Sequence, residues 1–289
     1  MIAQNLKLVY TTAKVRLGFL IMACALAGVA VSSGSTLSAW QLLVLGLAVL
    51  ASSAAAGAFN QLYERDTDAQ MKRTRKRPFV TGRFQPDASW MWGIGAVLVA
   101  AVAAAAWASN GLAALYIFLG AFTYGVVYTV WLKRRTWWNI VIGGLSGSFA
   151  VMAGAAAVGA ALEPAPMILA IVLFLWTPPH FWALAFACKK DYVAANIPML
   201  PVVVEDDIAS SAILGHAIAL VALSLTLVFF GMGWLYFLCA AFGGAYFIVE
   251  CVRLVYQPTV AKGWKAFAAS IVQLGLLLTG AILDNLLLS

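Results

Sequence analysis

Residues 38–68 read SAWQLLVLGLAVLASSAAAGAFNQLYERDTD. The apolar part of this stretch is long enough to cross the ~30 Å hydrocarbon layer of a membrane, which takes about 20 helical residues. It runs directly into a cluster of charges. If the helix continues, Asn60, Glu64 and Asp68 recur every four residues and lie along one face. The stretch therefore predicts a membrane-spanning helix whose end carries an amide and two carboxylates.

The composition places the whole chain in the same class. Of its 289 residues, 64% are hydrophobic and 10% are charged, whereas about a quarter of the residues of a soluble domain are charged. This excludes a soluble globular protein and indicates an integral membrane protein. The four cysteines have no CxxC or His-flanked spacing that would favour a metal site or a disulfide framework: Cys24, Cys188, Cys239 and Cys251.

Apolar runs of spanning length predict an all-α fold, a bundle of nine transmembrane helices forming a single domain over residues 1–289. A pseudo-repeat of helices 1–4 and 5–8, followed by helix 9, is compatible with this count. The predicted spans are 15–33, 38–62, 89–108, 111–132, 139–158, 166–188, 208–231, 234–255 and 264–284.

The basic residues predict the orientation of the bundle. All 18 lysines and arginines fall in the N-terminal arm, in even-numbered connections or at the span ends that adjoin them, so the positive-inside rule places the N-terminus in the cytoplasm and the C-terminus outside. The net charge of +7 is then explained by basic loops on one side, without a nucleic-acid partner. The two long connections that hold most of the acidic residues lie on that same cytoplasmic side.

The acidic residues after the second span suggest metal chemistry. Glu64, Asp66 and Asp68 repel one another unless a cation joins them, and hard oxygen ligands suit Mg²⁺ that bridges to phosphate. Pairing with the following basic run at a solvated helix end is the alternative interpretation. Because a diphosphate needs both metal and cations, we expect diphosphate contacts from nearby basic residues: Arg65, Lys72, Arg73, Arg77, Lys133 and Lys190.

The sixth span contains Pro178 and Pro179 beside His180. Two prolines remove backbone donors, which a membrane tolerates where protein or a cavity covers the freed carbonyls. His180 is therefore either a packing residue or a group that contacts a ligand or transfers a proton, whereas His216 is expected to be structural. Glu250 lies within a span and is expected to face the interior, to snorkel or to be neutral.

The Asn60–Asp68 cluster, continuing through Lys72 to Pro78, resembles the first aspartate-rich motif of the UbiA superfamily of intramembrane prenyltransferases. Residues 128–144, 177–184 and 190–203 are similar to stretches of one branch of that superfamily, the protohaem IX farnesyltransferases or haem O synthases. The resemblance covers roughly residues 10–205, and the last three spans by hydropathy only.

This resemblance implies a Mg²⁺-dependent reaction of farnesyl diphosphate with a vinyl group of haem b, giving haem O in the bacterial inner membrane, with the active site on the cytoplasmic side. Asn60, Glu64, Asp68 and Asp191 would hold the metal and diphosphate, and His180 would lie near the haem. A haem A synthase could take the product. The expected haem and prenyl pocket also contains aromatic residues: Tyr124, Tyr128, Trp176 and Trp182.

The sequence departs from the pattern of the resembled family at three places. Glu64 stands where an aspartate is usual, which keeps the charge but adds a methylene. Residues Lys14 to Arg16 read Lys-Val-Arg where the family has Lys-Pro-Arg. The second motif has a single acid, Asp191, with Ala187 four residues upstream.

Two other functions remain open at this point. A related prenyltransferase with an aromatic acceptor, making quinone or chlorophyll lipids, would use similar acidic motifs. A transporter could also be apolar and nine-spanning, but transporters commonly place coupling carboxylates near the bilayer midplane. Here every acid except Glu250 lies at a span end or in a loop.

Overall fold

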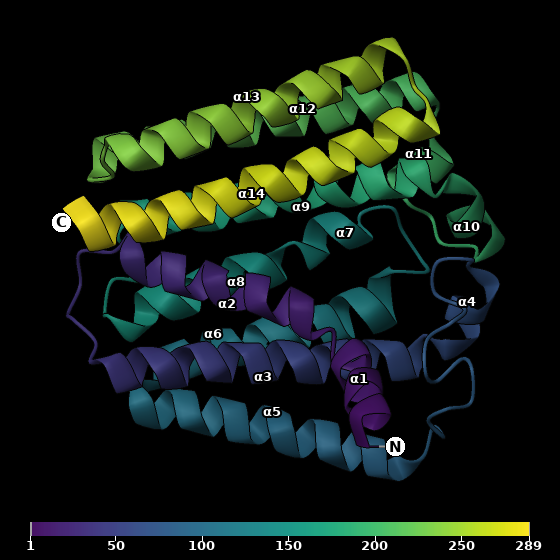
Figure 1. The fold of residues 1–289 in the computed structure, drawn as a ribbon, viewed down its shortest axis with the longest axis horizontal. Coiled ribbons are helices and arrows are strands. Elements are labelled where there is room, and N and C mark those ends of the chain that lie inside the picture. The colour runs from purple at the N-terminus through teal and green to yellow at the C-terminus, as the bar shows by residue number, and fades with distance from the viewer. Residues whose placement is uncertain (1, 289) are drawn as a thin grey trace.

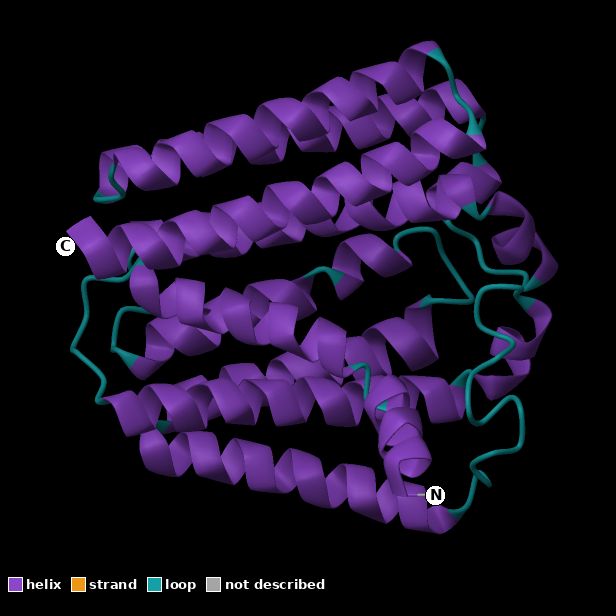
Figure 2. Cartoon of the chain, in the orientation of Figure 1, coloured by secondary structure: helices purple, strands orange, loops and turns teal. Residues whose placement is uncertain are grey.

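The computed structural model describes the backbone of residues 2–288 and the side chains of residues 7–288. All regular elements in this part of the chain are helical, and none is a strand, as Figure 2 shows. The α-helices are α1 (Ile2–Thr12), α2 (Val15–Ala30), α3 (Ala39–Tyr63), α4 (Arg65–Gln70), α5 (Ala88–Ala108), α6 (Gly111–Phe122), α7 (Asn139–Gly143), α8 (Leu145–Ala157), α9 (Pro164–Ala187), α10 (Lys189–Ala194), α11 (Leu200–Val203), α12 (Asp206–Leu225), α13 (Trp234–Tyr256) and α14 (Val260–Leu288).

Two of the spans end in a helical segment that is not α-helical. The π-helix η1 (Thr123–Leu132) continues α6, and the 3₁₀ segment η2 (Thr226–Phe230) continues α12. With these continuations, eight helical segments of the described chain are long and apolar enough to cross a membrane. They correspond to the predicted second to ninth spans. The predicted first span, 15–33, is the shorter α2 of 16 residues.

The long helices run side by side, and successive connections alternate between the two ends of the bundle (Figure 1). The short helices α4, α10 and α11 gather at one end, shown on the right, together with the long connections around them. The C-terminal end of α14 lies at the opposite end. The two acidic connections that the sequence placed on one side are therefore neighbours in space.

Small residues set the distance between α2 and α8. A Cβ atom on Gly154 would lie 1.9 Å from the carbonyl oxygen of Ala25, and one on Gly28 would lie 2.2 Å from that of Val151. Neither position accepts a side chain without moving backbone. Small residues allow such close helix contacts in membranes, where association depends on packing.

The junction of α1 and α2 lies against α3 by the same means. A Cβ atom on Gly57 would lie 3.1 Å from the carbonyl oxygen of Ala13 and 3.3 Å from the Cβ atom of Lys14. Lys14 itself has a left-handed backbone conformation with φ of 49°, which is uncommon outside glycine. This local geometry places the Lys14 side chain beside the last turn of α3.

Glu250 faces the protein interior, as expected for a carboxylate within a span. Its exposed fraction is 3%, and its Oε1 atom accepts a hydrogen bond of 2.5 Å from Arg253 one turn further along α13. A charge that is neutralised within its own helix avoids the cost of facing lipid.

Candidate active site

A cavity of about 370 Å³ extends between α2, α3, α6, α8, α9 and α14. Its polar end is lined by Lys14, Asn60, Glu64, Asp68, Arg73, Arg77 and Lys133. Its apolar end is lined by Cys24, Val49, Leu173, Trp176, Phe267 and Leu274, with His180 on the same wall. Tyr124 and Tyr128 also line it, and their rings stack with centroids 5.6 Å apart. Ten of the residues predicted for the site therefore share one cavity.

The polar end is built on the continuation of α3 into α4. The backbone N–H of Glu64 donates to the carbonyl of Asn60 at 3.0 Å, and that of Asp68 donates to the carbonyl of Glu64 at 2.8 Å. The four-residue repeat therefore persists although α3 ends at Tyr63. All three side chains are buried and line the cavity, so they lie on one face, as their spacing predicted.

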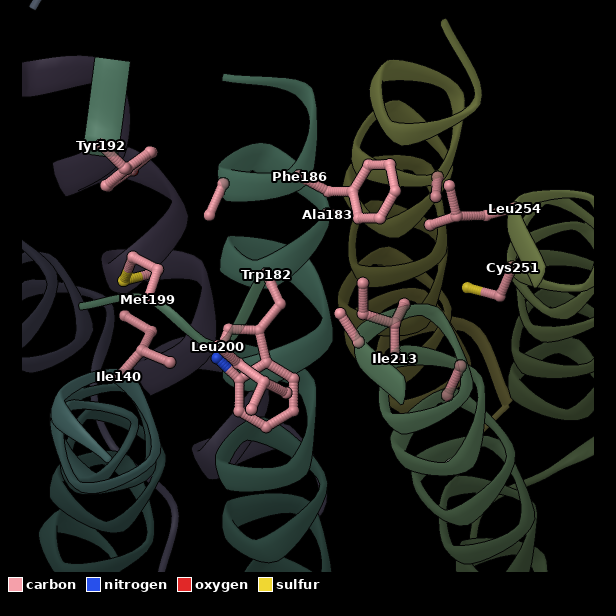
Figure 3. Close-up of a cluster of buried hydrophobic side chains, with 14 of the residues drawn as sticks. Ile140, Trp182, Ala183, Phe186, Tyr192, Met199, Leu200, Ile213, Cys251 and Leu254 are labelled. Atoms are coloured by element: carbon pink, nitrogen blue, oxygen red, sulfur yellow. The ribbon is translucent and has the colours of Figure 1, made fainter. Parts of the chain in front are cut away.

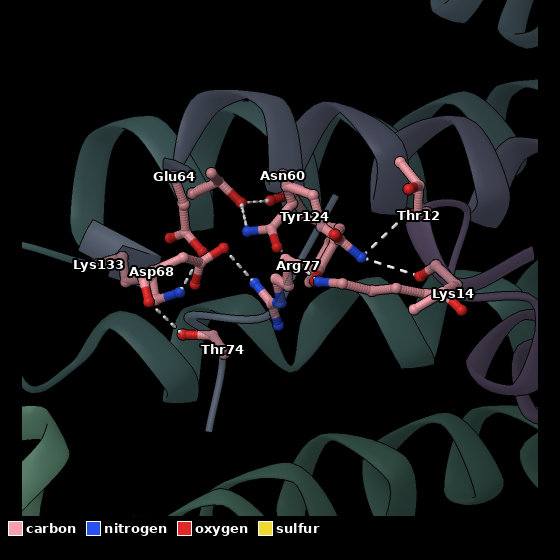
Figure 4. A network of polar contacts seen from close by, with 12 residues as sticks. Thr12, Lys14, Asn60, Glu64, Asp68, Thr74, Arg77, Tyr124 and Lys133 are labelled. Carbon is pink, nitrogen blue, oxygen red and sulfur yellow. Dashed lines mark hydrogen bonds and ion pairs between the residues drawn. The ribbon is translucent and has the colours of Figure 1, made fainter. Parts of the chain in front are cut away.

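Each carboxylate of this group faces a cation from another segment (Figure 4). Lys133, just after η1, contacts Oε2 of Glu64 at 2.5 Å, and Arg77 contacts Oδ2 of Asp68 at 2.5 Å. Burial alone would raise the pKa of Glu64, but the charge and hydrogen bond of Lys133 hold it below its usual value. Glu64 is thus a carboxylate, and its Oε1 atom is buried without a hydrogen-bond partner.

Lys14 completes the polar end, and the sequence interpretation did not include it in the site. Its Nζ atom donates to Oδ1 of Asn60 at 2.5 Å and to the hydroxyl of Tyr124 at 2.9 Å. The Asn60 amide in turn donates to Oγ1 of Thr129 at 3.0 Å, which fixes its orientation. Burial, followed by repulsion from Arg77, lowers the pKa of Lys14 well below its usual value. The sequence feature that could have identified Lys14 as a site residue is its place in the Lys-Val-Arg stretch, which stands where the resembled family has Lys-Pro-Arg.

The second acidic connection meets the first at the mouth of the cavity. Oδ2 of Asp191 accepts a hydrogen bond of 3.1 Å from the backbone N–H of Arg73. Asp191, at the start of α10, does not itself line the cavity. The structure thus brings the two connections together, with Asp191 in contact with the backbone of Arg73 and outside the cavity lining that Asn60 shares.

Three of the predicted diphosphate-binding residues also lie outside the cavity lining. Lys72 and Lys190 are exposed. Arg65 follows Glu64 directly, and a step of one residue turns a helical side chain by about 100°. Its guanidinium accordingly lies near Asp66 at 3.8 Å and donates to the carbonyl of Leu62.

The prediction that Trp182 lines the pocket is corrected by its position. Trp182 follows His180 by two residues, which is about 200° around the helix, so its ring points away from the cavity. It is 2% exposed and packs in the core with Ile140, Met199 and Leu200 (Figure 3). Trp176, one turn before His180, shares the cavity face.

The oxygen atoms of the polar end suit a hard divalent cation. No three of the His, Cys, Asp and Glu side chains in the described residues are grouped closely enough to form a metal site by themselves. Asn60, Glu64 and Asp68 instead offer one amide and two carboxylates, and the unpartnered Oε1 of Glu64 is a free oxygen ligand. This mixed set, completed by substrate oxygens and water, is typical of Mg²⁺.

Comparison with known proteins agrees with this arrangement. The sequence model of the UbiA prenyltransferase family matches residues 21–276. The chain belongs to the UbiA prenyltransferase family. The resemblance read from the four motifs is thus confirmed, and with it the assignment to prenyltransferases.

Two relatives of this UbiA-family chain come from Paramagnetospirillum magneticum. The chain is 53% identical to its protoheme IX farnesyltransferase 2 over 283 residues, which is 98% of both chains. It is 45% identical to protoheme IX farnesyltransferase 1 over 246 residues, 84% of this chain and 86% of the relative. The first of these similarities covers nearly the whole chain and so includes the last three spans, which the motifs did not cover.

Solved structures confirm the UbiA fold. A digeranylgeranylglyceryl phosphate synthase has a TM-score of 0.78 at 16% identity, covering 98% of this chain and 99% of the other. A UbiA homologue of Aeropyrum pernix K1 has a TM-score of 0.75 at 19% identity, covering 93% and 98%. A homologue of Archaeoglobus fulgidus bound to GPP and Mg²⁺ has a TM-score of 0.66 at 16% identity, covering 93% and 99%.

Proposed function

We propose that this protein transfers the farnesyl group of farnesyl diphosphate to a vinyl group of haem b, with addition of water, releasing diphosphate and giving haem O. The observation that carries the proposal is a single cavity in which buried carboxylates and cations adjoin an aromatic, apolar end. The 53% identity to a protoheme IX farnesyltransferase over 98% of both chains supports this acceptor.

The polar end would bind the diphosphate. Asn60, Glu64 and Asp68 would hold Mg²⁺, which supplies Lewis-acid neutralisation of the leaving oxygens; the GPP and Mg²⁺ bound to the Archaeoglobus fulgidus homologue support this role. Four cations of the cavity wall would bind the remaining anionic charge: Lys14, Arg73, Arg77 and Lys133. Asp191 would position Arg73 through its backbone contact.

The apolar end would receive the farnesyl chain and the macrocycle. As the allylic C1–O bond breaks, the electron pair leaves with diphosphate, whose charge the cationic side chains stabilise. The vinyl carbon then bonds to C1, and water adds to the new cation with loss of a proton. The faces of Tyr124 and Tyr128 would stabilise the allylic cation, and the apolar walls would exclude water until that bond has formed.

The proposed setting is a bacterial cytoplasmic membrane. We extend the eight long helices to nine spans by including α2, whose 16 residues rise about 24 Å. The gathering of the basic connections at one end (Figure 1) supports a cytoplasmic N-terminus and a cytoplasmic mouth of the cavity. Direct transfer of the apolar product to a haem A synthase within the bilayer would fit this setting.

Acceptor choice tests the proposal. Purified protein in detergent receives farnesyl diphosphate with either haem b or 4-hydroxybenzoate, in Mg²⁺ or in EDTA, and products are resolved by mass spectrometry. We expect haem O with haem b and Mg²⁺, and neither product in EDTA. Formation of prenylated 4-hydroxybenzoate without haem O would contradict haem b as the acceptor and favour an aromatic acceptor instead.

A further inference from the structure

The imidazole of His180 is enclosed on most sides. The rings of Trp176 and Phe267 stack on it with centroids 4.2 and 4.6 Å away, and the ring of Phe181 meets it edge-on at 4.9 Å. Its Nδ1 atom lies 2.7 Å from the hydroxyl oxygen of Ser270 on α14. Because His180 also lines the cavity, the ring edge that carries Nε2 is the part left to meet a ligand.

The hydrogen bonds of Ser270 determine which nitrogen of His180 carries the proton. The Ser270 hydroxyl donates to the carbonyl oxygen of Phe267 at 2.6 Å. A carbonyl oxygen can only accept, so the single hydroxyl hydrogen is used in that bond. Towards His180 the Ser270 oxygen must therefore accept, and Nδ1 of His180 must be the donor.

It follows that Nε2 of a neutral His180 holds a lone pair. None of the contacts described for His180 is with a carboxylate, and its neighbours are apolar apart from Ser270, so the surroundings favour the neutral imidazole. Nε2 has no hydrogen-bond partner among the described residues, yet it is not one of the atoms sealed from solvent. The lone pair is therefore directed at open space on the cavity side.

We propose that Nε2 of His180 is an axial ligand of the iron of the haem substrate, and that Ser270 is the positioning residue that fixes the ligating tautomer. The inference rests on the proposed function for its substrate. Neutral imidazole is a common ligand of haem iron. Ligating histidines usually donate their other N–H to a second group, which sets tautomer and ring orientation. Here that group is Ser270.

The chain provides a matched control, because His216 is its one other histidine. His216 lies on α12, where its Nδ1 atom is 3.0 Å from the carbonyl oxygen of Ala212 and its ring meets Trp182 edge-on. It does not line the cavity. Ser210 similarly controls for Ser270, since it is equally buried and its hydroxyl donates to the carbonyl of Asp207.

The test uses full-length protein labelled with [¹⁵N]histidine and loaded with ferric haem b, without farnesyl diphosphate. Electron paramagnetic resonance with hyperfine detection reports ¹⁵N bound to iron. We expect the coupling in the wild type and in His216→Gln, and its loss in His180→Ala, where added imidazole restores an axial nitrogen. Unchanged coupling in His180→Ala, or haem-loaded wild type without coupling, would overturn the inference.

The role of Ser270 is tested by haem titration. Loss of an outer partner typically lowers metal affinity about 10- to 100-fold, so Ser270→Ala should weaken haem binding by that factor and shift the haem spectrum. Ser270→Thr, which keeps the hydroxyl, and Ser210→Ala should resemble the wild type. Equal affinity and spectrum in Ser270→Ala would remove Ser270 from this role.

Turnover of the same preparations separates this inference from the proposed function. Haem O formation by wild type that lacks histidine coordination would overturn the inference alone. Histidine coordination without haem O formation in the presence of farnesyl diphosphate and Mg²⁺ would overturn the proposed function alone.

Discussion

The two ends of the cavity hold their side chains in place by different means. At the polar end, residues from segments far apart in the sequence are joined by buried ion pairs, such as Glu64 with Lys133 across 69 positions. At the apolar end, Trp176 and His180 are one turn apart on α9, and Phe267 and Ser270 are one turn apart on α14. One end depends on charge partners and the other on helix packing.

This difference determines how each end should respond to substitution. A buried charge that loses its partner carries an uncompensated desolvation cost, whereas an aromatic wall loses only the contacts of the ring that is removed. Substitutions at the polar end should therefore lower both the stability and the activity of the protein. Substitutions at the apolar end should mainly weaken substrate binding.

The largest effect is expected for Lys133→Ala. This change leaves Glu64, whose side chain is 2% exposed, without its partner, and breaking a buried pair costs about 3–5 kcal/mol. The free energy of unfolding, measured by SDS titration in detergent micelles without Mg²⁺, should fall by that amount.

The half-exposed pair of Lys189 with Asp206, with side-chain exposures of 37% and 44%, is the control for this measurement. Lys189→Ala should cost at most about 1 kcal/mol. Equal losses of unfolding free energy in Lys133→Ala and Lys189→Ala would contradict the interpretation that the ion pair of Glu64 with Lys133 is a buried, desolvated contact.

Next in size is Lys14→Met. Removal of one group that stabilises developing negative charge costs about 100-fold or more in turnover. The change also removes the hydrogen bond that Oδ1 of Asn60 accepts from Lys14. Arg16→Met is the control, because Arg16 is exposed two residues away. Haem O formed per minute at saturating substrates is the readout, and similar rates in both variants would exclude Lys14 from the site.

A smaller effect is expected for Trp176→Ala at the apolar end. An aromatic pair contributes about 0.5–1.5 kcal/mol beyond burial, so KM for haem b should rise about 2- to 10-fold while kcat changes little. Trp107→Ala, at a ring that is 77% exposed, should leave KM unchanged. A fall in kcat with constant KM for Trp176→Ala would contradict a role in holding the macrocycle.

The sequence predicted most of the spans because each is a long apolar run, and it predicted the common face of Asn60, Glu64 and Asp68 from their spacing. It did not find Lys14, because 46 positions separate Lys14 from Asn60 and no periodicity connects two helices. Trp182 was assigned to the pocket wrongly, because a helix with apolar residues on most of its circumference does not reveal which face meets a cavity and which meets other helices.

Asp191 shows the same limit in the connections. Its charge and its side of the bundle could be predicted, but its contact with the backbone of Arg73 depends on the paths of two loops. The tautomer of His180 likewise depends on Ser270, 90 positions away. Local patterns therefore predicted the types of residue in the site, and tertiary packing determined which of them meet.

The most direct test of one cavity with two binding ends is the binding of both substrates to Asp68→Asn. Haem b is titrated by its Soret absorption, and radiolabelled farnesyl diphosphate by equilibrium binding in Mg²⁺. Because Asp68 lies at the polar end with Arg77, we predict wild-type affinity for haem b and at least about 10-fold weaker binding of farnesyl diphosphate. Equal weakening of both ligands, or of neither, would contradict the division of the cavity into a diphosphate end and a haem end.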